Sequence, residues 1–440
     1  MSPATATLEP PEDGLVAAPP EVRAALPPLR RSWVWYRSPG LAVPAWIVSL
    51  TGMIGYAVWV YQTAPHGFVD LAVYRFGIRA WWHGGDLYGH LPATVAGHLP
   101  YVYPPITAVI LAPLNALTWD GAIIATLVAS LLALIVVVYL TFLRVFPGAG
   151  RRGALLAAAA LTPVALSLEP VWDTLWYGQI NIVLAAMVLI DCFATSKRWP
   201  RGVLIGVAAA IKLTPAVFLL YFLLRKDFRS ASRLVISTAV VTAAGFAVNW
   251  GGSVKYWFGA SGGARSISGS PFYTNQTVDG LLARWGLAGP QQTAIWLACA
   301  LVLLAATVLG VHRAGRLGDT PLAVVITAGF GLVVSPTSWS NHWVYVAPAL
   351  IVLAGHVWRQ RGPLWGPVCV AVGAVFGLAP FLYLPLPATG WTPLQQIPGN
   401  AFLITGVVLL IGFALPDVPV AWRAARVRLG RHPSPVPCER

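Results

Sequence analysis

Residues 121–143 read GAIIATLVASLLALIVVVYLTFL, a continuous apolar run in which no side chain is charged. About 20 consecutive apolar residues are enough for an α-helix to cross the hydrocarbon core of a bilayer. A surface so poor in charge is stable only in lipid. Residues 121–143 are therefore predicted to form a membrane-spanning helix.

The whole chain has a similar composition. Of its 440 residues, 57% are hydrophobic and only 10% are charged, whereas an ordinary soluble protein carries about 25% charged residues. The net charge is +14, but the cations fall in short clusters between apolar runs and form no basic stripe with interleaved aromatic side chains. The composition therefore predicts an all-α, polytopic membrane protein and argues against nucleic acid as a partner.

Twelve apolar runs have a length that suits a membrane helix. They lie near residues 43–62, 102–118, 121–143, 153–168, 174–195, 202–224, 232–250, 292–311, 320–335, 343–357, 365–380 and 400–415. An even number of spans puts both termini on one side, and the arginine-rich C-terminal tail makes that side the cytoplasm. A disordered, Pro-rich cytoplasmic tail at 1–42 and a basic cytoplasmic tail at 417–440 then flank a transmembrane domain at 43–416. Large extracytoplasmic loops are expected at about 63–101, 251–291 and 381–399.

The distribution of positive charge conflicts with this arrangement at two places. Arg151–Arg152 and Lys197–Arg201 would lie outside, although basic clusters favour the cytoplasmic side. The conflict disappears if 102–118 only dips into the membrane and 202–224 turns back as a hairpin, which also moves 169–181 to the outer face. Charge alone leaves both arrangements open, and twelve spans are kept as the working prediction.

Motifs that would bind a metal or a soluble nucleotide are missing from the sequence. The four cysteines have no CxxC spacing, and the outer loops contain no DxD pair that could hold a metal with a nucleotide-sugar. No metal and no cofactor are therefore expected. A sugar donor used on the outer face would be lipid-borne.

An acidic residue stands directly after the first predicted span, in FVDLAVY at 68–74. Asp70 is flanked by apolar side chains, which partly desolvate its carboxylate, raise its pKa and make it a better proton acceptor. An Asp at this place could instead cap a helix by accepting a backbone N–H. Position alone leaves both interpretations open.

The following stretch, LAVYRFGIRAWWHG, has apolar residues at helical spacing and is predicted to form an amphipathic helix along the membrane interface. Arg75 and Arg79 lie four residues apart on its polar face, where they could bind phosphate groups or simply be solvated. Tyr74 and Asp86 are candidates for sugar or acceptor binding, although Asp86 follows two glycines, as residues in a turn do.

Lys212 lies near the middle of the apolar run 202–224. A charge at such a position costs about 2.5–3.5 kcal/mol on insertion scales, so a partner is expected. In a protein that handles lipids, a phosphate would serve as that partner. The alternative is that the side chain snorkels to water.

Amides and a histidine gather where other predicted spans end, and such groups suit contacts to sugar hydroxyls. The amides are Gln179 and Asn181 in WYGQIN, Asn275 and Gln276 in YTNQT, and Asn341 in SWSNHW. His342 is either a satisfied interfacial histidine or a contact to phosphate or sugar. The many aromatic side chains of the outer loops are also consistent with an interfacial belt.

Several of these stretches together resemble the GT87 (DUF2029) family of actinobacterial membrane mannosyltransferases and arabinofuranosyltransferases. They are FVDLAVYRFGIRAWWHGGDLYG, YPPITAVILAPL, WYGQINIVLAAMVL, GVAAAIKLTPAVFLLYFLLR, TNQTVDGLLARWG and SPTSWSNHWVY. They follow one another in the family's order between about residues 65 and 350. Each stretch is weak alone, and the ordered set is specific.

The resemblance implies a GT-C-like fold with about twelve transmembrane helices, in which an acid in the first outer loop is the catalytic base. That acid corresponds to Asp70. The second large outer loop follows the seventh predicted span, as in that fold, which favours twelve spans over the hairpin. Similar enzymes take their sugar from a polyprenyl phosphate and act on the extracytoplasmic face of the plasma membrane.

The function implied by the resemblance is that of an inverting mannosyltransferase of cell envelope biosynthesis. It would move mannose from polyprenyl-phosphate-mannose to a glycolipid of the phosphatidylinositol mannoside type, in α-1,2 linkage. Lys212, His342, Arg75 and Arg79 are then candidates for the donor phosphate. Two alternatives stay open, namely an arabinofuranosyltransferase that uses decaprenyl-phosphate-arabinose, and a lipid-carrier flippase or transporter without catalysis.

Overall fold

The computed structural model describes residues 40–64, 67–194, 196, 198–259, 269–360 and 364–415. Almost all of the predicted tails, 1–42 and 417–440, lies outside the described residues, as does part of the predicted loop 251–291. The described residues form α-helices and short 3₁₀ helices and contain no β-strand. The prediction of an all-α protein is confirmed.

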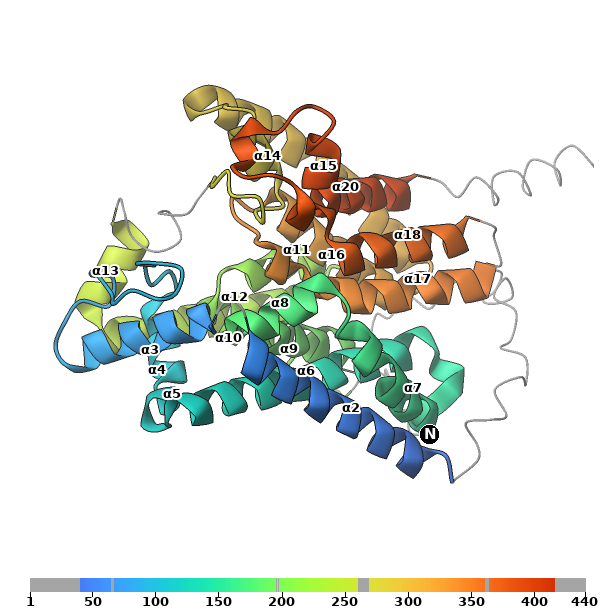
Figure 1. The fold of residues 1–440 in the computed structure, drawn as a ribbon. Coiled ribbons are helices and arrows are strands. Elements are labelled where there is room, and N and C mark those ends of the chain that lie inside the picture. The colour runs from blue at the N-terminus through green and yellow to red at the C-terminus, as the bar shows by residue number, and fades with distance from the viewer. Residues whose placement is uncertain are drawn as a thin grey trace, which may run out of the picture.

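Most of the longer helices of the described residues pack together in one bundle (Figure 1). They are α2 (Ala42–Thr63), α6 (Trp119–Val145), α7 (Gly150–Ala165), α9 (Asn181–Phe193), α12 (Phe228–Val248), α15 (Gly289–Arg316), α16 (Thr320–Val334), α17 (Val346–Gln360), α18 (Trp365–Leu378) and α20 (Ala401–Ala414). By length and composition, α2, α6, α12 and α15 are each able to cross a membrane. A fifth span results if α7 is taken together with its continuation α8 (Glu169–Tyr177), which is bent by 75°. These helices make the chain a membrane protein.

Polar residues between the apolar runs set where several of these helices begin. Thr118 accepts a hydrogen bond from the backbone N–H of Gly121 at the start of α6. Asp227 and Asp319 do the same at the starts of α12 and α16. Each side chain satisfies an N–H group that has no partner within its helix.

The helix ends and connections meet at two opposite ends of the bundle. At the first, which we call the basic end, Arg144 of α6 donates to the backbone carbonyl of Phe193 at the end of α9. At the same end, Asp319 lies 3.3 Å from His356 and 3.4 Å from Arg359, both on α17. In Figure 1 the basic end is on the right, where α2 begins.

The second end, which we call the loop end, carries most of the shorter helices. They are α3 (Val69–Trp82), α4 (Pro105–Leu111), α5 (Pro113–Ala116), α8, α13 (Trp250–Phe258), α14 (Val278–Arg284) and α19 (Gln396–Gly399), with the 3₁₀ helices η5 (Ser340–Tyr345), η6 (Pro380–Tyr383) and η7 (Ala388–Gly390). Figure 1 shows α3, α4 and α13 together on the left. The 3₁₀ helix η2 (Pro147–Ala149) joins α6 to α7 at the basic end.

The predicted span 102–118 does not cross the bundle. It forms α4 and α5, of seven and four residues, which meet at Ala112–Pro113. Arg75 of α3 donates to the backbone carbonyls of Leu117 and Thr118, at 2.8 and 2.9 Å, and so holds the end of this segment at the loop end. Because proline has no N–H to continue a helix, the apolar run is broken into pieces too short to span.

The predicted span 202–224 is a hairpin. Helix α10 (Val203–Ile211) leads from the basic end toward the loop end, the chain turns through Lys212 and η3 (Thr214–Val217), and α11 (Phe218–Leu224) leads back. Arg201, before the hairpin, lies 3.6 Å from Asp227, after it. Both ends of the segment are therefore at the basic end, and the prediction that it spans the membrane is corrected.

Two glycines allow α10 to lie against α12. Gly202 has a φ of +96°, and a Cβ at this position would collide with the carbonyl oxygen of Ser230. A Cβ on Gly206 would lie only 2.6 Å from the carbonyl oxygen of Leu234. A residue with a side chain would push the two helices apart at both positions.

The prediction of twelve spans is therefore corrected at two runs, since 102–118 stays at the loop end and 202–224 is a hairpin. Apolar length cannot separate a span from a hairpin, because both bury an apolar run of the same length. Because 102–118 does not cross the bundle, residues 169–181 lie at the loop end, where Gln179 contacts Asp70. Arg151 and Arg201 then lie together at the basic end, so the conflict with the charge rule disappears.

We expect a reagent applied to one side of the membrane to reach both ends of the hairpin. In a chain without its native cysteines, Arg198→Cys and Lys226→Cys should react with a membrane-impermeant maleimide from the same side. Val95→Cys, at the loop end, should react only from the other side; all three positions are exposed. Reaction of Arg198→Cys and Lys226→Cys from opposite sides would show that 202–224 is a span.

Candidate active site

Asp70 lies in the first turn of α3, at the loop end. The chain enters the helix through Gly67 and Phe68, whose φ values are 55° and 54°, and the neighbours Val69 and Leu71 are buried. The start of the helix has no side-chain cap hydrogen bond. Asp70 is therefore not a helix cap, and its carboxylate has a different partner.

Gln179 holds this carboxylate in place. Its Nε2 donates to Asp70 Oδ2 at 2.6 Å, and its Oε1 accepts hydrogen bonds from the hydroxyls of Tyr74 and Tyr103, each at 3.0 Å. Because hydroxyl hydrogens must meet the amide oxygen, the two tyrosines turn the amide N–H toward Asp70. Tyr74 was predicted to contact a sugar, but its side chain is only 1% exposed. Its hydroxyl instead orients Gln179 through the hydrogen bond to Oε1.

A glycine lets Gln179 approach α3. Gly178 ends α8 in the left-handed conformation, with a φ of 69°. A Cβ on Gly178 would lie 2.8 Å from the Cβ of Leu71. The motif WYGQIN therefore needs its glycine to bring the amide to the carboxylate.

Burial raises the pKa of Asp70 to about 6, and the hydrogen bond from Gln179 and the positive charge of Lys212 offset part of this effect. The carboxylate is therefore ionised at neutral pH but binds a proton more readily than an exposed aspartate does. These are the properties of a general base that works near neutral pH.

Lys212 reaches the same region from the tip of the hairpin. Its Nζ donates to Asn181 Oδ1 at 2.8 Å, to His342 Nε2 at 3.0 Å and to the hydroxyl of Tyr103 at 3.4 Å. Asn181 Nδ2 in turn donates to the backbone carbonyl of Asn341 at 2.9 Å, which turns its oxygen toward the lysine. Lys212 thus has partners inside the protein, as its position in an apolar run required.

Tyr103 links the two charged groups and is a site residue that sequence reasoning missed. Its hydroxyl bonds both to Gln179, the partner of Asp70, and to Lys212. Its ring lies 5.4 Å from Lys212 Nζ, a cation–π distance. The assignment of 102–118 to a span hid this residue, although the tyrosines and prolines of YVYPP mark the end of an outer loop.

His342 is a neutral hydrogen-bond donor. Burial and the charge of Lys212 hold the pKa of its imidazole well below the usual range. Burial lowers the pKa of Lys212 to about 7. When Lys212 carries its charge it can only donate, so Nε2 of His342 accepts and the imidazole proton lies on Nδ1. Nδ1 is buried and has no hydrogen-bond partner in the part of the chain that the structure describes.

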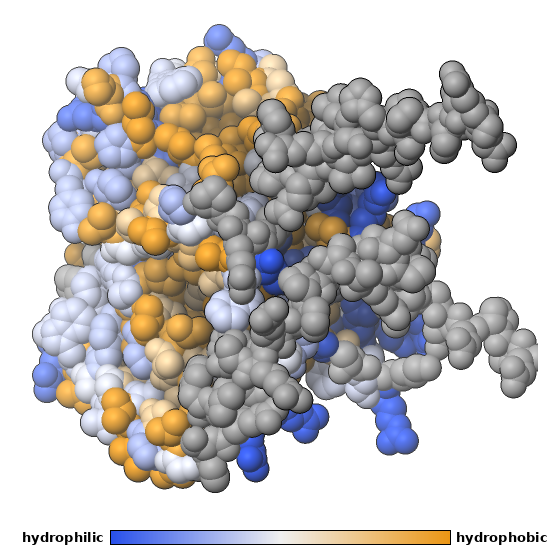
Figure 2. Space-filling model, turned by 90° about the vertical axis from the view of Figure 1, so that its right-hand side faces the viewer, coloured by the Kyte–Doolittle hydropathy of each residue, from blue (hydrophilic) through white to orange (hydrophobic). Residues whose placement is uncertain are grey.

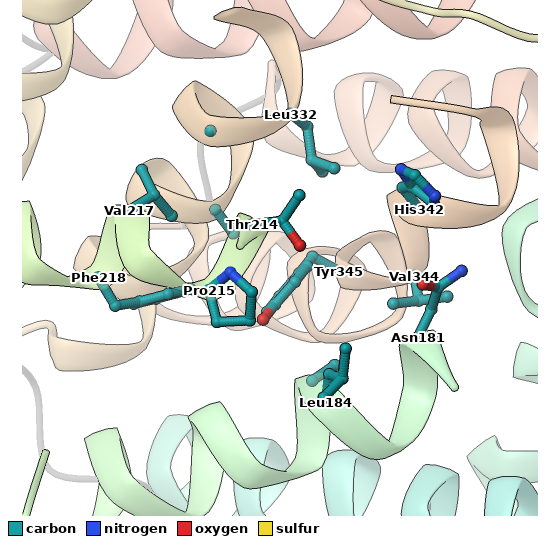
Figure 3. Close-up of a pocket in the computed structure, with 13 residues that line it drawn as sticks. Asn181, Leu184, Thr214, Pro215, Val217, Phe218, Leu332, His342, Val344 and Tyr345 are labelled. Atoms are coloured by element: carbon teal, nitrogen blue, oxygen red, sulfur yellow. The ribbon is translucent and has the colours of Figure 1, made fainter. Parts of the chain in front are cut away.

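A small, mostly apolar pocket of about 40 Å³ lies beside these polar groups (Figure 3). Asn181 and His342 lie at one side of it, and Pro215 and Phe218 of the hairpin segment lie at the other. Leu332 of α16 covers it from a third direction. Its lining therefore places apolar side chains directly beside the polar groups of Asn181 and His342.

Three other predicted ligands are placed elsewhere. Arg75 is buried, and its guanidinium is occupied by the protein's own backbone carbonyls. Arg79 is exposed on α3, and Asp86 forms an ion pair with Lys255 of α13. The predicted phosphate role of Arg75 is therefore corrected to a structural one, and Asp86 joins the first outer loop to α13.

Asn275 and Gln276 belong to the scaffold rather than to the site. Both are fully buried. Asn275 Oδ1 accepts from the backbone N–H of Ser338 at 3.0 Å, and Gln276 Nε2 donates to the carbonyl of Gly399 at 2.9 Å. These bonds join three connections of the loop end, so the predicted sugar contacts of the two amides are corrected.

Two further acids lie near Asp70. Glu169 and Asp173 stand one turn apart on α8 and are 1% and 6% exposed. The charges of Asp173 and Asp70 act on each other. The sequence LEPVWDTLWYGQIN contains both acids, but it does not show that they are buried. Their burial distinguishes them from solvated acids at a membrane interface.

Comparison with known proteins places this chain in a family. The family model described as "Glycosyltransferase family 87" matches residues 101–336, more than half of the chain. The chain belongs to glycosyltransferase family 87. It is therefore a glycosyltransferase, as the ordered motifs predicted, and not a transporter without catalysis.

Relatives of this family 87 glycosyltransferase include two enzymes named polyprenol-phosphate-mannose-dependent alpha-(1-2)-phosphatidylinositol mannoside mannosyltransferase. One, from Mycobacterium tuberculosis, is 38% identical over 78% of this chain and 81% of its own. The other, from Mycolicibacterium smegmatis, is 39% identical over 82% and 84%. A Mycobacterium tuberculosis enzyme named for a pentamannoside substrate is 33% identical over 69% and 70%. No solved structure matches the chain.

Replacing Arg75 should lower the folding stability of this family 87 enzyme without changing its affinity for the donor. Arg75→Gln removes two charge-assisted hydrogen bonds to buried carbonyls and should lower the free energy of unfolding by about 2 kcal/mol or more. Thermal unfolding in detergent measures this, and Arg79→Gln is the matched control that should unfold like the wild type. A donor KM that rises in Arg75→Gln while stability stays unchanged would restore the phosphate role.

Proposed function

We propose that this glycosyltransferase is an inverting mannosyltransferase that takes mannose from polyprenyl-phosphate-mannose. The acceptor is a glycolipid of the phosphatidylinositol mannoside type, and the new linkage is α-1,2. The observation that carries the proposal is the linked pair of Asp70 and Lys212, because the Lys212 partners Asn181 and His342 also line a small, mostly apolar pocket. A base, a cation and apolar side chains that suit a lipid therefore lie close together.

The names of the relatives support the choice of donor and acceptor. Three of them are polyprenol-phosphate-mannose-dependent enzymes that act on phosphatidylinositol mannosides. The site itself suits a donor of this chemical class, because its phosphate is charged and its polyprenyl chain is apolar. The apolar side chains of the hairpin that line the pocket, such as Pro215 and Phe218, would contact the start of the polyprenyl chain, with the phosphate near Lys212.

In the proposed reaction, Asp70 takes the proton of an acceptor hydroxyl while that oxygen attacks C1 of the mannose. The attack comes from the face opposite the phosphate, the C1–O bond breaks, and the electron pair leaves with the lipid phosphate. The β-linked donor therefore yields an α-mannoside. Lys212 and the free Nδ1–H of His342 stabilise the negative charge that develops on the leaving phosphate.

The proposed orientation places the basic end in the cytoplasm and the loop end outside the plasma membrane. The positive charges at the basic end favour this orientation. Asp70 and Lys212 then face the extracytoplasmic side, where a lipid-borne sugar is the available donor. A GT-C-like fold, here with ten spanning helices and a hairpin, is part of the same proposal.

The direct test uses the purified protein in proteoliposomes with a phosphatidylinositol mannoside acceptor. Labelled polyprenyl-phosphate-mannose and decaprenyl-phosphate-arabinose are supplied in separate reactions. We expect label from the mannose donor alone to reach the acceptor, in a product that an α-1,2-mannosidase releases. Transfer of arabinose instead of mannose would overturn the choice of sugar and support the arabinofuranosyltransferase alternative.

Asp70→Asn should lower the transfer rate by about 10²–10⁴-fold, the usual contribution of a positioned general base. Asparagine keeps the size of the side chain and can still accept the hydrogen bond from Gln179, so the site should stay assembled. Single-turnover assays at saturating donor measure the chemical step. Protein yield and donor binding serve as controls, and a variant with the wild-type rate would exclude Asp70 as the base.

The pH dependence of kcat/KM should show an acidic limb near pH 6, because Asp70 must be deprotonated to accept a proton and its pKa is raised to about 6. Gln179→Leu removes a hydrogen bond that lowers this pKa. The acidic limb should therefore move to higher pH in the variant. A limb that stays in place would show that another group controls the rate.

A further inference from the structure

A cluster of three arginines surrounds one tyrosine at the basic end, at the opposite end of the hairpin from Lys212. Arg144 lies in the last turn of α6, Arg201 precedes α10 and Arg225 follows α11. The charges of all three act on the hydroxyl of Tyr221, which lies on α11. We call these four residues the arginine cluster.

The cluster holds more positive charge than its neighbours neutralise. Arg201 lies 3.6 Å from Asp227. The other nearby acid, Asp191, is occupied, because its oxygens accept hydrogen bonds from Trp199 Nε1 and from the backbone N–H groups of Gly202 and Ile205. Three guanidinium groups therefore share a single paired carboxylate.

Hydrogen-bond donors in the cluster are buried and unused. Arg201 Nε, Arg225 Nη1 and the hydroxyl of Tyr221 have no partner in the described part of the chain, and Tyr221 is fully buried. Leaving such groups unpaired costs free energy, so native proteins pair nearly all of them.

Aromatic rings hold the guanidinium groups in position. Arg201 lies over the ring of Phe222 at 5.8 Å, and Arg225 lies over the ring of Tyr221 at 5.5 Å. The two rings are themselves in contact, with centroids 5.2 Å apart. A planar guanidinium fixed in this way presents its N–H groups in a fork that matches the oxygens of a phosphate.

We propose that the arginine cluster binds the phosphate group of an anionic phospholipid. Arg201 Nε, Arg225 Nη1 and the Tyr221 hydroxyl would donate to its oxygens. Leu223 and Phe228, beside the cluster in the sequence, are 43% and 63% exposed, which suits lipid chains rather than a free anion in water. Figure 2 views the molecule from this end and shows hydrophilic side chains gathered next to apolar ones.

A lipid bound here fastens the base of the hairpin. The phosphate would join Arg201 before α10 to Arg225 after α11, and so hold the two ends of the hairpin together. Because the tip of the same hairpin carries Lys212, the bound lipid stabilises the arrangement that the active site uses. The binding itself does not depend on which sugar or acceptor the enzyme takes.

The test measures lipid binding to the purified full-length protein in detergent. Phosphatidylglycerol, phosphatidylcholine and inorganic phosphate are titrated separately, with native mass spectrometry and thermal unfolding as readouts. We expect phosphatidylglycerol alone to be retained and to raise Tm. Equal retention of phosphatidylcholine would overturn the site, and an equal rise with inorganic phosphate would show that its ligand is a free anion rather than a lipid.

Three variants distinguish specific lipid binding at the arginine cluster from non-specific attraction between positive residues and anionic lipid. Arg225→Gln and Tyr221→Phe should each weaken phosphatidylglycerol binding, Arg225→Gln by about tenfold or more. Arg229→Gln removes an exposed charge at the same end and should bind like the wild type. Tyr221→Phe removes an unpaired hydroxyl without changing the charge, so it should fold normally. Unchanged binding in Tyr221→Phe, or equal losses in Arg225→Gln and Arg229→Gln, would overturn the proposal.

Discussion

The buried ammonium group of Lys212 is the constraint on which the loop end depends. Moving a cation out of water costs roughly several kcal/mol of solvation free energy. Hydrogen-bond acceptors and an opposite charge in the protein must offset this cost. Asn181, Tyr103 and His342 supply the acceptors, and Asp70 supplies the opposite charge. These residues come from four separate segments of the chain. Satisfying one cation therefore brings α3, the end of the first outer loop, α9 and η5 together.

The hairpin is what allows a lysine to occupy this place. A lysine at the middle of a spanning helix would face the centre of the bilayer, whereas the tip of a hairpin that starts at the basic end reaches the loop end. Close packing of Gly202 and Gly206 against α12 holds the first arm, and the break at Lys212 and Pro215 turns the chain. Because 102–118 does not cross the bundle, the helices from α6 to α9 run in the opposite direction to those of a twelve-span chain, which brings 169–181 to the loop end. The hairpin then restores the twelve-span direction for α12 and every later helix, so the two changes together explain the charge pattern.

The sequence was sufficient to predict those parts of the structure that a local pattern determines. Ten of the twelve apolar runs correspond to helices of the bundle, and the polar positions within or beside such runs point to Asp70, Lys212, Gln179, Asn181 and His342. The sequence leaves the hairpin undecided, because hydropathy does not show where a chain reverses. Asn275 and Gln276 were assigned to the site because a polar side chain at the end of a span suits a scaffold and a ligand equally well. Only their partners, Ser338 and Gly399, decide between the two.

The pairing of Asp70 with Lys212 also bears on how the proposed reaction balances its charges. Before the reaction each group offsets the burial of the other, since the charge of Lys212 keeps the pKa of Asp70 from rising further. When Asp70 accepts the proton of the acceptor, its negative charge disappears and Lys212 loses its counter-charge. At the same moment a negative charge develops on the leaving phosphate. The lysine can therefore exchange a carboxylate for a phosphate without either anion or cation being left unpaired in the site, which favours the transition state over the resting state.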